Sequence, residues 1–333
     1  MQRCKMTVTA SILVLVIGSL FNLELKADEA SLANEQPTKK LVYLVSDARI
    51  PFWEIMSRGV KSAAESLGYK VDTYSADNNA KRELENTIRA IKDNVSGIIV
   101  SPTNSSASAT ILNLAKKAGI PVVISDIGTD GGEYVSYISS NNKTGAYEIG
   151  RVLAKRMHEL GWQNGRVGII AIPQKRANGQ ARTAGFMRAM NEAGIKGADI
   201  RQQVTFSYQE TYDFSRELIG KYPDLRAIWL QGSDRYQGAL DAIDDAGKKG
   251  DVLLICFDAE PIFLELIPQG VLVGAAMQQP YLMGAEAARV MDRHLNGQKV
   301  EKNIRLDILA ISEENIEEKL SIIHENVLGI ERR

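Results

Sequence analysis

The sequence has few residues of the kinds that most often carry out catalysis or bind metals. Its 333 residues include two cysteines and three histidines. Cys256 stands alone in the apolar run LLICFD, and Cys4 lies near the N-terminus. A lone thiol forms no internal disulfide, and its apolar neighbours favour a small buried side chain over a catalytic nucleophile. His158, His294 and His324 have charged neighbours in helical stretches, which indicates surface positions.

Sequence motifs of several enzyme and cofactor classes are also missing. The chain has no HExxH, GxSxG, CxxC or GxxxxGK[ST]. No GxGxxG follows the first predicted strand, so a dinucleotide site lacks its main sequence support. No cluster of acidic residues and histidines suggests a transition metal. We therefore expect no catalytic residues, no metal and no cofactor.

Neither charge sign is in excess. Lys and Arg number 40 and Asp and Glu 41, which gives a formal net charge of -1. A nucleic-acid binder would show a basic excess or stripe, so we expect no nucleic-acid partner. The sequence also lacks a long Pro/Ser linker and any low-complexity tract, so its parts must be joined by short crossings, as in a hinge.

The N-terminus has the pattern of a secretory signal peptide. Arg3 and Lys5 precede the uncharged apolar stretch from Met6 to Phe21, and small residues follow at Ala27 and Ala33. The apolar stretch is slightly short for a membrane-spanning helix. We expect a signal peptide over residues 1–27, with an uncleaved anchor as the alternative.

From Leu41 onward, short apolar runs alternate with amphipathic stretches. Predicted strands lie at 41–46, 71–76, 97–102, 121–126, 166–173, 200–206, 225–232, 251–258 and 272–278. Their Val- and Ile-rich composition is typical of parallel strands buried on both faces. A TIM barrel also alternates strands and helices, but this chain has more than eight such units. We predict an α/β fold of two Rossmann-like lobes with parallel, doubly wound sheets, divided near Ser140 and Asn141.

Polar residues recur where the predicted strands end. They are Ser46–Asp47, Ser101–Asn104, Asp126, Ser140–Asn142, Gln231–Asp234, Asp258 and Gln278. In open α/β sheets, ligands bind at the carboxyl ends of the strands. Helix N-capping is the alternative for each residue alone, because Ser, Asp and Asn are preferred caps. The whole series facing one cleft favours a binding site.

The order and spacing of several segments resemble the periplasmic sugar-binding proteins of the ribose and galactose type, which share a fold with the lactose-repressor effector domain. The segments are VSDARIPFWEIMSRGVKSAAESLGY, GIIVSPTNSSA, AGIPVVISD, YISSNNKTGAYEIG, ARTAGF, ICFDAEP and AAMQQPYLMG. They span the chain from about Leu41 to Ile316. The resemblance implies a first lobe of residues 40–140 plus 279–304, and a second lobe of residues 141–278 plus 305–333.

The resemblance also implies which residues contact a ligand. Phe52 and Trp53 match an aromatic pair that stacks on a sugar ring, whose C–H groups suit an aromatic face; a core contact for the helix is the alternative for either ring. With Ser140 from the strand ends, the expected ligand-binding residues are Ser46, Phe52, Trp53, Asp126, Arg182, Tyr208, Asp258 and Gln278. Phe206 is the alternative to Tyr208.

Three positions depart from the ribose-type pattern. Ile50 and Ile127 replace an asparagine and an arginine, and the stretch Gly232–Asp234 replaces an asparagine–aspartate pair. These departures put ribose itself in doubt and favour a different or less hydroxylated ligand. Solvated surface charge is the expected role for Arg49 and for the pair Asp234–Arg235.

The function that the resemblance implies is binding of a small sugar-like ligand in the periplasm by a monomer. The lobes would close on the ligand, and a membrane permease of an ABC importer would recognise the closed form. A sensor that reports to a membrane histidine kinase or chemoreceptor is the alternative. A transcription factor would need an N-terminal helix-turn-helix, and an enzyme would need an acid/base set that the sequence does not supply.

Overall fold

The computed structural model describes residues 39–330. The expected signal peptide, residues 1–27, lies outside the described residues. Among the helices of residues 39–330, none combines the length and the apolar character that crossing a membrane requires.

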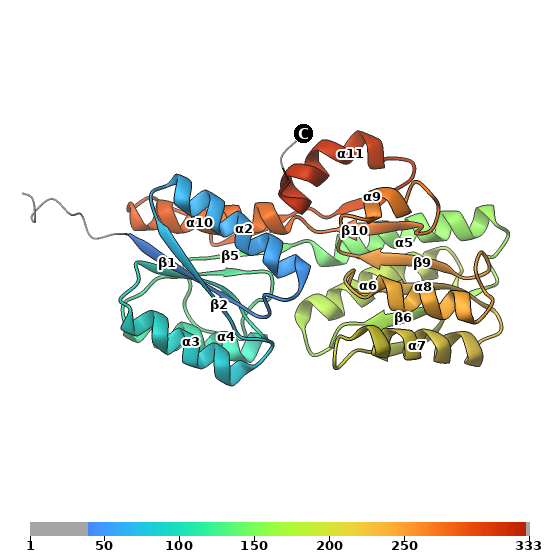
Figure 1. Ribbon diagram of the computed structural model, residues 1–333, viewed down its shortest axis with the longest axis horizontal. Helices are drawn as coiled ribbons and strands as arrows, with labels where there is room; N and C mark the ends of the chain where they lie inside the picture. The colour runs from blue at the N-terminus through green and yellow to red at the C-terminus, as the bar shows by residue number, and fades with distance from the viewer. Residues whose placement is uncertain (1–38, 331–333) are drawn as a thin grey trace, which may run out of the picture. The chain divides into compact units, whose positions relative to one another are not determined.

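The first sheet has six parallel strands, with helices against its two faces (Figure 1). Its order is β11 (Asn303–Leu306), β5 (Ser136–Ser140), β4 (Val122–Ser125), β3 (Gly97–Ser101), β1 (Lys40–Val45) and β2 (Lys70–Ser75). Its helices are α2 (Pro51–Ser66), α3 (Ala80–Lys92), α4 (Ser105–Lys117) and α10 (Pro280–Leu295). Strands β3 and β4 are buried throughout, which explains their continuous apolar sequence. We call this sheet with its helices the first lobe.

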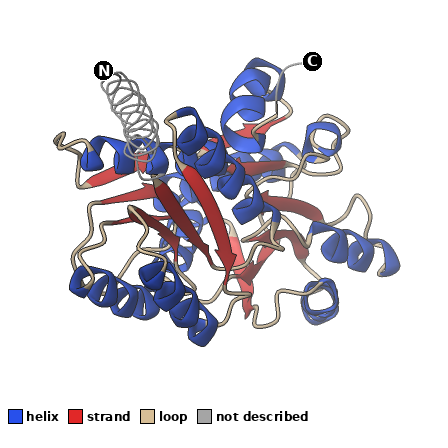
Figure 2. Ribbon diagram, turned by 60° about the vertical axis from the view of Figure 1, so that its left-hand side comes forward, coloured by secondary structure: helices blue, strands red, loops and turns tan. Residues whose placement is uncertain are grey.

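The second sheet repeats this arrangement and forms the second lobe. Its order is β12 (Leu309–Ser312), β10 (Gly274–Met277), β9 (Leu253–Phe257), β8 (Leu225–Leu230), β6 (Arg166–Ala171) and β7 (Lys196–Gln202). All neighbours are parallel except β10 and β12. Its helices are α5 (Asn142–Glu159), α6 (Ala177–Glu192), α7 (Tyr208–Lys221), α8 (Tyr236–Asp245) and the short α9 (Phe263–Leu266); α11 (Ile316–Ile322) and the π-helix η1 (Ile323–Leu328) follow β12. The predicted two-lobed α/β fold is confirmed (Figure 2).

Three short crossings join the lobes, between β5 and α5, between β10 and α10, and between β11 and β12. The N–H of Asn141 donates to the carbonyl of Leu306 at 2.9 Å, and Gln279 Nε2 donates to the carbonyl of Asp307 at 2.8 Å. These bonds connect the crossings to one another, as expected of a hinge region. The boundary expected between residues 304 and 305 falls inside β11.

Most residues that the sequence analysis excludes from chemistry lie as expected; His324, expected at the surface, is half-buried. Cys256 is fully buried in β9, and His158 and His294 are exposed. Each lobe has core clusters of aliphatic and aromatic side chains, and Ile55 of α2 joins a cluster of the second lobe. The second lobe includes Phe186 stacked on Trp229, with ring centroids 3.9 Å apart.

Helices α2 and α10 of the first lobe pack closely because glycines face the partner helix. A Cβ atom on Gly59 would lie 2.1 Å from the carbonyl oxygen of Tyr281, and one on Gly284 would lie 2.2 Å from that of Met56. These distances are shorter than any van der Waals contact, so a side chain at either position would push the helices apart.

Gly59→Ala should therefore lower the free energy of unfolding, by about 1–3 kcal/mol as for other overpacked cores. Gly220→Ala is the matched control, since Gly220 lies in α7 and a Cβ atom there would meet no other atom within 4 Å. That substitution should raise the free energy of unfolding by about 0.5–1 kcal/mol through helix propensity. Urea unfolding curves measure both, and equal stability of Gly59→Ala and wild type would contradict the close contact.

Candidate functional site

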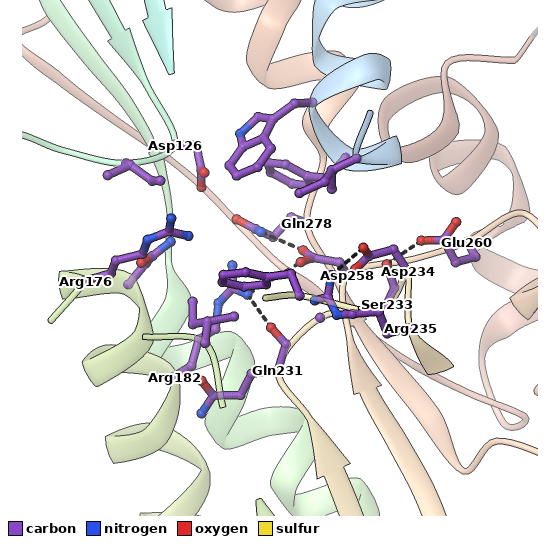
Figure 3. A pocket seen from close by; sticks show the side chains of 18 residues that line it. Asp126, Arg176, Arg182, Gln231, Ser233, Asp234, Arg235, Asp258, Glu260 and Gln278 are labelled. Atoms are coloured by element: carbon purple, nitrogen blue, oxygen red, sulfur yellow. Dashed lines mark hydrogen bonds and ion pairs between the residues drawn. The ribbon is translucent and has the colours of Figure 1, made fainter. Parts of the chain in front are cut away.

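The carboxyl ends of strands from both lobes enclose a pocket with about 530 Å³ of empty space (Figure 3). The first lobe contributes Ile50, Phe52, Trp53, Asp126 and Ile127. The second lobe contributes Ile172, Arg176, Asn178, Arg182, Phe206, Gln231, Gly232, Ser233, Asp234, Arg235, Asp258 and Glu260, and Gln278 comes from a crossing.

Two aspartates occupy equivalent positions in the lobes. Asp126 follows β4 with φ 65°, and Asp258 follows β9 with φ 69°. Their N–H groups donate to the carbonyls of Ile138 and Ala276 in the next strand, at 3.0 and 2.9 Å. Aspartate tolerates this left-handed backbone better than most residues, and the conformation turns both carboxyl groups into the pocket. Burial raises the pKa of Asp126 to about 6, although Arg182 opposes the shift.

The carboxyl group of Asp258 is held by two side chains. Gln278 Nε2 donates to Oδ1 at 2.6 Å, and Arg182 Nη1 lies 3.5 Å from Oδ2. Arg182 also donates to Asn142 Oδ1 at 2.8 Å and to the carbonyl of Gln231 at 3.0 Å. Burial raises the pKa of Asp258, and Arg182 opposes this. The network fixes an arginine, a carboxyl group and a hinge amide in one orientation.

The first-lobe aromatic pair has two roles. Helix α2 begins at Pro51, and Phe52 and Trp53 occupy its first turn with ring centroids 6.0 Å apart and planes at 78°. Trp53 is 7% exposed and belongs to the core cluster of the first lobe, yet it also lines the pocket. The ring of Trp53 is therefore placed to pack in the core and to contact a ligand.

Phe206 is the second-lobe aromatic that lines the pocket. The predicted strand 200–206 is wrong at its end, because β7 stops at Gln202. The carboxylate of Glu210 accepts hydrogen bonds from the N–H groups of residues 204, 205 and 206, at 2.8–3.2 Å, and Phe206 has a φ of 53°. The guanidinium groups of Arg176 and Arg235 lie 5.6 and 5.1 Å from the centre of its ring.

Three predicted site residues do not line the pocket. Tyr208 is the first residue of α7 and is 45% exposed; its hydroxyl donates to Asp241 at 2.6 Å and its ring stacks on Tyr212. Ser46 and Ser140 are buried at the ends of β1 and β5, and within residues 39–330 neither hydroxyl has a hydrogen-bond partner.

The pair Asp234–Arg235 lies in the pocket, so its expected role as solvated surface charge is wrong. Arg235 is 6% exposed and forms an ion pair with Asp234. Ser233 donates to Glu260 at 2.7 Å, and burial raises the pKa of Glu260 to about 7. Arg49, in contrast, is 71% exposed and pairs with Asp47 at 2.6 Å, as expected. Sequence reasoning missed Arg176 and Glu260, because loop residues after a strand show no periodicity.

Six pocket side chains present a buried polar atom that has no partner within the described part of the chain. The donors are Trp53 Nε1, Arg176 Nε and Arg235 Nε, and the acceptors are Asp126 Oδ1, Gln231 Oε1 and Gln278 Oε1. All six side chains belong to residues at most 8% exposed. Buried polar groups usually have partners, so these atoms indicate where a ligand would bind. No three acidic, histidine or cysteine side chains of residues 39–330 are grouped to hold a metal ion.

Residues 41–299 match the family model described as "Periplasmic binding protein domain", and the chain belongs to this family. The ribose import binding protein RbsB of Escherichia coli (strain K12) is 29% identical over 280 residues, which cover 83% of this chain and 91% of the relative. The D-allose-binding periplasmic protein of the same strain is 25% identical over 269 residues, 77% of this chain and 84% of the relative.

Solved structures show the same fold. A periplasmic solute-binding protein of an ABC transporter from Actinobacillus succinogenes 130z, with bound D-allose, has a TM-score of 0.78 at 21% identity, covering 84% of this chain and 100% of that one. A carbohydrate transporter solute-binding protein from Agrobacterium radiobacter, in complex with D-arabinose, has a TM-score of 0.80 at 21% identity, covering 88% and 100%.

A buried carboxyl group beside the pocket makes stability depend on pH. Glu83 of α3 is 1% exposed and accepts hydrogen bonds from the N–H and the hydroxyl of Thr103, both at 2.8 Å. Burial raises the pKa of Glu83 from 4.5 to about 7. The folded protein therefore keeps a proton between these values that the unfolded chain loses.

The free energy of unfolding should fall as pH rises from about 4.5 to about 7, by at most about 1.4 kcal/mol per pH unit for this group. Glu83→Gln should reduce that slope in urea titrations at several pH values. Glu85→Gln changes an exposed carboxyl group of the same helix and should leave the slope as in wild type. The same slope in all three proteins would show that Glu83 does not titrate as described.

Proposed function

We propose that this protein is a periplasmic solute-binding protein that closes on a neutral, sugar-like polyol and delivers it to an ABC importer. Its family and the names of its relatives support this proposal. Those relatives are named as import or sugar-binding proteins, which favours delivery to a permease over the sensing alternative. We infer a binding role without catalysis, since Gln278 and Arg182 hold the carboxyl group of Asp258 and Ser233 binds that of Glu260.

The observation that carries the proposal is the balance of unpartnered atoms in the pocket. Three donors and three acceptors belong to side chains that line the ligand space. A hydroxyl group both donates and accepts, so a polyol can satisfy both kinds. A carboxylate ligand would leave the acceptors Asp126, Gln231 and Gln278 without partners. An ammonium ligand would leave the donors of Trp53, Arg176 and Arg235 without partners. An unsatisfied buried group costs about 1–3 kcal/mol.

The apolar side chains of the pocket indicate the shape of the ligand. Phe52 and Trp53 approach from one lobe and Phe206 from the other, which suits a ring with C–H groups on its faces. Ile50, Ile127 and Ile172 also line the pocket. A hydroxyl group against these side chains would have no partner, so we infer a ligand with at least one edge that lacks hydroxyl groups.

Export to the periplasm belongs to the same proposal. The N-terminal pattern of residues 1–27 and the family support it. We infer a monomer that a membrane permease recognises in its closed form. Mass measurement of the exported protein should give a chain that begins after Ala27 or after Ala33.

A thermal-shift screen tests the ligand class. The panel contains D-ribose, D-allose, D-arabinose, myo-inositol and deoxysugars, with glucosamine and gluconate as cationic and anionic analogues. We expect a neutral polyol to raise the unfolding temperature, since ligand at 100 times its Kd adds about 2.7 kcal/mol of stability.

Trp53→Phe keeps an aromatic ring and removes the N–H, so it should weaken binding of that polyol by about tenfold, which is the effect of one hydrogen bond. Trp162→Phe, outside the pocket, is the control and should bind normally. Stabilisation by gluconate or glucosamine alone would count against a neutral polyol.

Affinity should also depend on pH through Asp126. A hydroxyl group donates more strongly to an ionised than to a neutral carboxyl group. Because the pKa of Asp126 is about 6, affinity should be constant above about pH 7 and fall as pH drops through 6, by at most tenfold per pH unit.

Calorimetric titrations of the best polyol at several pH values measure this dependence. Asp126→Asn tolerates the same left-handed backbone and should bind more weakly with a flatter pH profile. Glu260→Gln controls for the other pocket carboxyl group and should retain the fall near pH 6. A wild-type profile in Asp126→Asn would assign the titration to a different group.

A further inference from the structure

Arg176 lies at the boundary between the ligand pocket and the opposite lobe. It follows β6 in the second lobe, is the residue before helix α6, and is 8% exposed. Its side chain lines the pocket (Figure 3). Its Nη2 donates to the carbonyl of Thr103 at 3.2 Å and lies 3.4 Å from Asn78 Oδ1. Thr103 and Asn78 belong to the first lobe, so the side chain bridges the two lobes.

The bridge lies away from the crossings. Asn78 follows β2, the edge strand of the first sheet, and Thr103 follows β3. Two of the three crossings leave from β5 and β11, at the opposite edge of that sheet. A contact far from the hinge opposes opening more effectively than the same contact beside the hinge, because its lever arm is longer.

The acceptors on the first lobe are fixed in place. Glu83 holds Thr103 through its N–H and its hydroxyl, both at 2.8 Å, and Glu83 is itself buried. The N–H of Asn78 donates to the carbonyl of Ser46 at 2.7 Å, and Asn78 has a φ of 58°. The guanidinium group therefore meets a preformed surface.

The bonding of Arg176 is incomplete without a ligand. Its Nε has no hydrogen-bond partner within residues 39–330, and Asp126 acts on the guanidinium group electrostatically without bonding to it. The face of Phe206 lies 5.6 Å away. A buried guanidinium group is costly unless its N–H groups are satisfied, so an oxygen atom at Nε would favour the bridged arrangement.

We propose that Arg176 couples ligand binding to lobe closure: its Nη2 binds the first lobe while its Nε donates to an oxygen atom of the bound ligand. The ligand completes the hydrogen bonds of the arginine, and the arginine holds the lobes together over the ligand. Closure and binding then stabilise each other. This role rests on the proposed function and names a residue that sequence reasoning did not assign to the site.

Arginine variants test the coupling by stopped-flow kinetics. The probe is the member of the panel D-ribose, D-allose, D-arabinose and myo-inositol that stabilises the wild type most. Arg176→Lys retains the charge but loses Nε and the forked geometry, and Arg176→Met retains an apolar stem. We expect the dissociation rate to rise at least tenfold in both, with an association rate within about threefold of wild type. Thermal unfolding without ligand confirms that each variant is folded.

A second variant should strengthen the bridge. Asn78→Asp places a carboxylate opposite Arg176 and tolerates the same backbone. It should slow dissociation of the probe several-fold and, without ligand, shift solution scattering toward a more compact form. Asn94→Asp is the matched control, because Asn94 also has a positive φ, 48°, is exposed, and lies in the same lobe away from the pocket. It should have neither effect.

The outcomes separate the two proposals. If no member of the panel binds the wild type, the proposed function fails, and the ligand-free scattering of Asn78→Asp still tests the bridge. If the probe binds but leaves Arg176→Lys and Arg176→Met at the wild-type rate, the coupling role is wrong. It is equally wrong if Asn78→Asp has the same effect in the Arg176→Met background, since the new carboxylate would then act without the arginine.

Discussion

The cleft between the lobes depends on buried charged groups, which need hydrogen bonds and ion pairs from neighbouring side chains. Arg182, Asp258 and Gln278 come from α6, from the end of β9 and from a crossing, and both Arg182 and Gln278 contact the carboxyl group of Asp258. Removing one partner of a buried ion pair is strongly destabilising, because the remaining charge stays buried. This network therefore constrains the second lobe and the hinge together, and it explains why a crossing residue carries a polar side chain in the interior.

The same constraint explains the incomplete bonding elsewhere in the pocket. Trp53, Asp126 and Arg235 each present a buried atom without a partner in the described chain. A cluster of such atoms is unusual in a protein interior. It is consistent with a site in which the ligand completes a hydrogen-bonded network. The closed arrangement of the lobes is then favoured only when the ligand is present.

The sequence was sufficient to predict the fold because parallel strands buried on both faces leave continuous apolar runs. Asp126, Asp258 and Gln278 were predictable for a related reason, since each directly follows such a run. Phe206 was harder to place, because its position depends on the carboxylate of Glu210, which ends β7 early. Arg176 and Arg235 lie in loops, where no periodicity distinguishes a buried guanidinium group from a solvated one; only the packing of both against Phe206 does so.

The two walls of the cleft differ in how they are organised. On the second lobe, Asp234 pairs with Arg235, Ser233 binds Glu260, and Arg182 holds Asp258, so these polar groups are oriented by contacts within that lobe. Arg176 differs, because it bonds to the first lobe. The first lobe contributes mainly aromatic and aliphatic side chains, with Asp126 as its carboxyl group in the pocket. Groups that are already held lose little conformational entropy when a ligand binds. The second lobe therefore provides the oriented polar surface, and closure of the first lobe adds apolar contact area and excludes water, which strengthens every hydrogen bond already made.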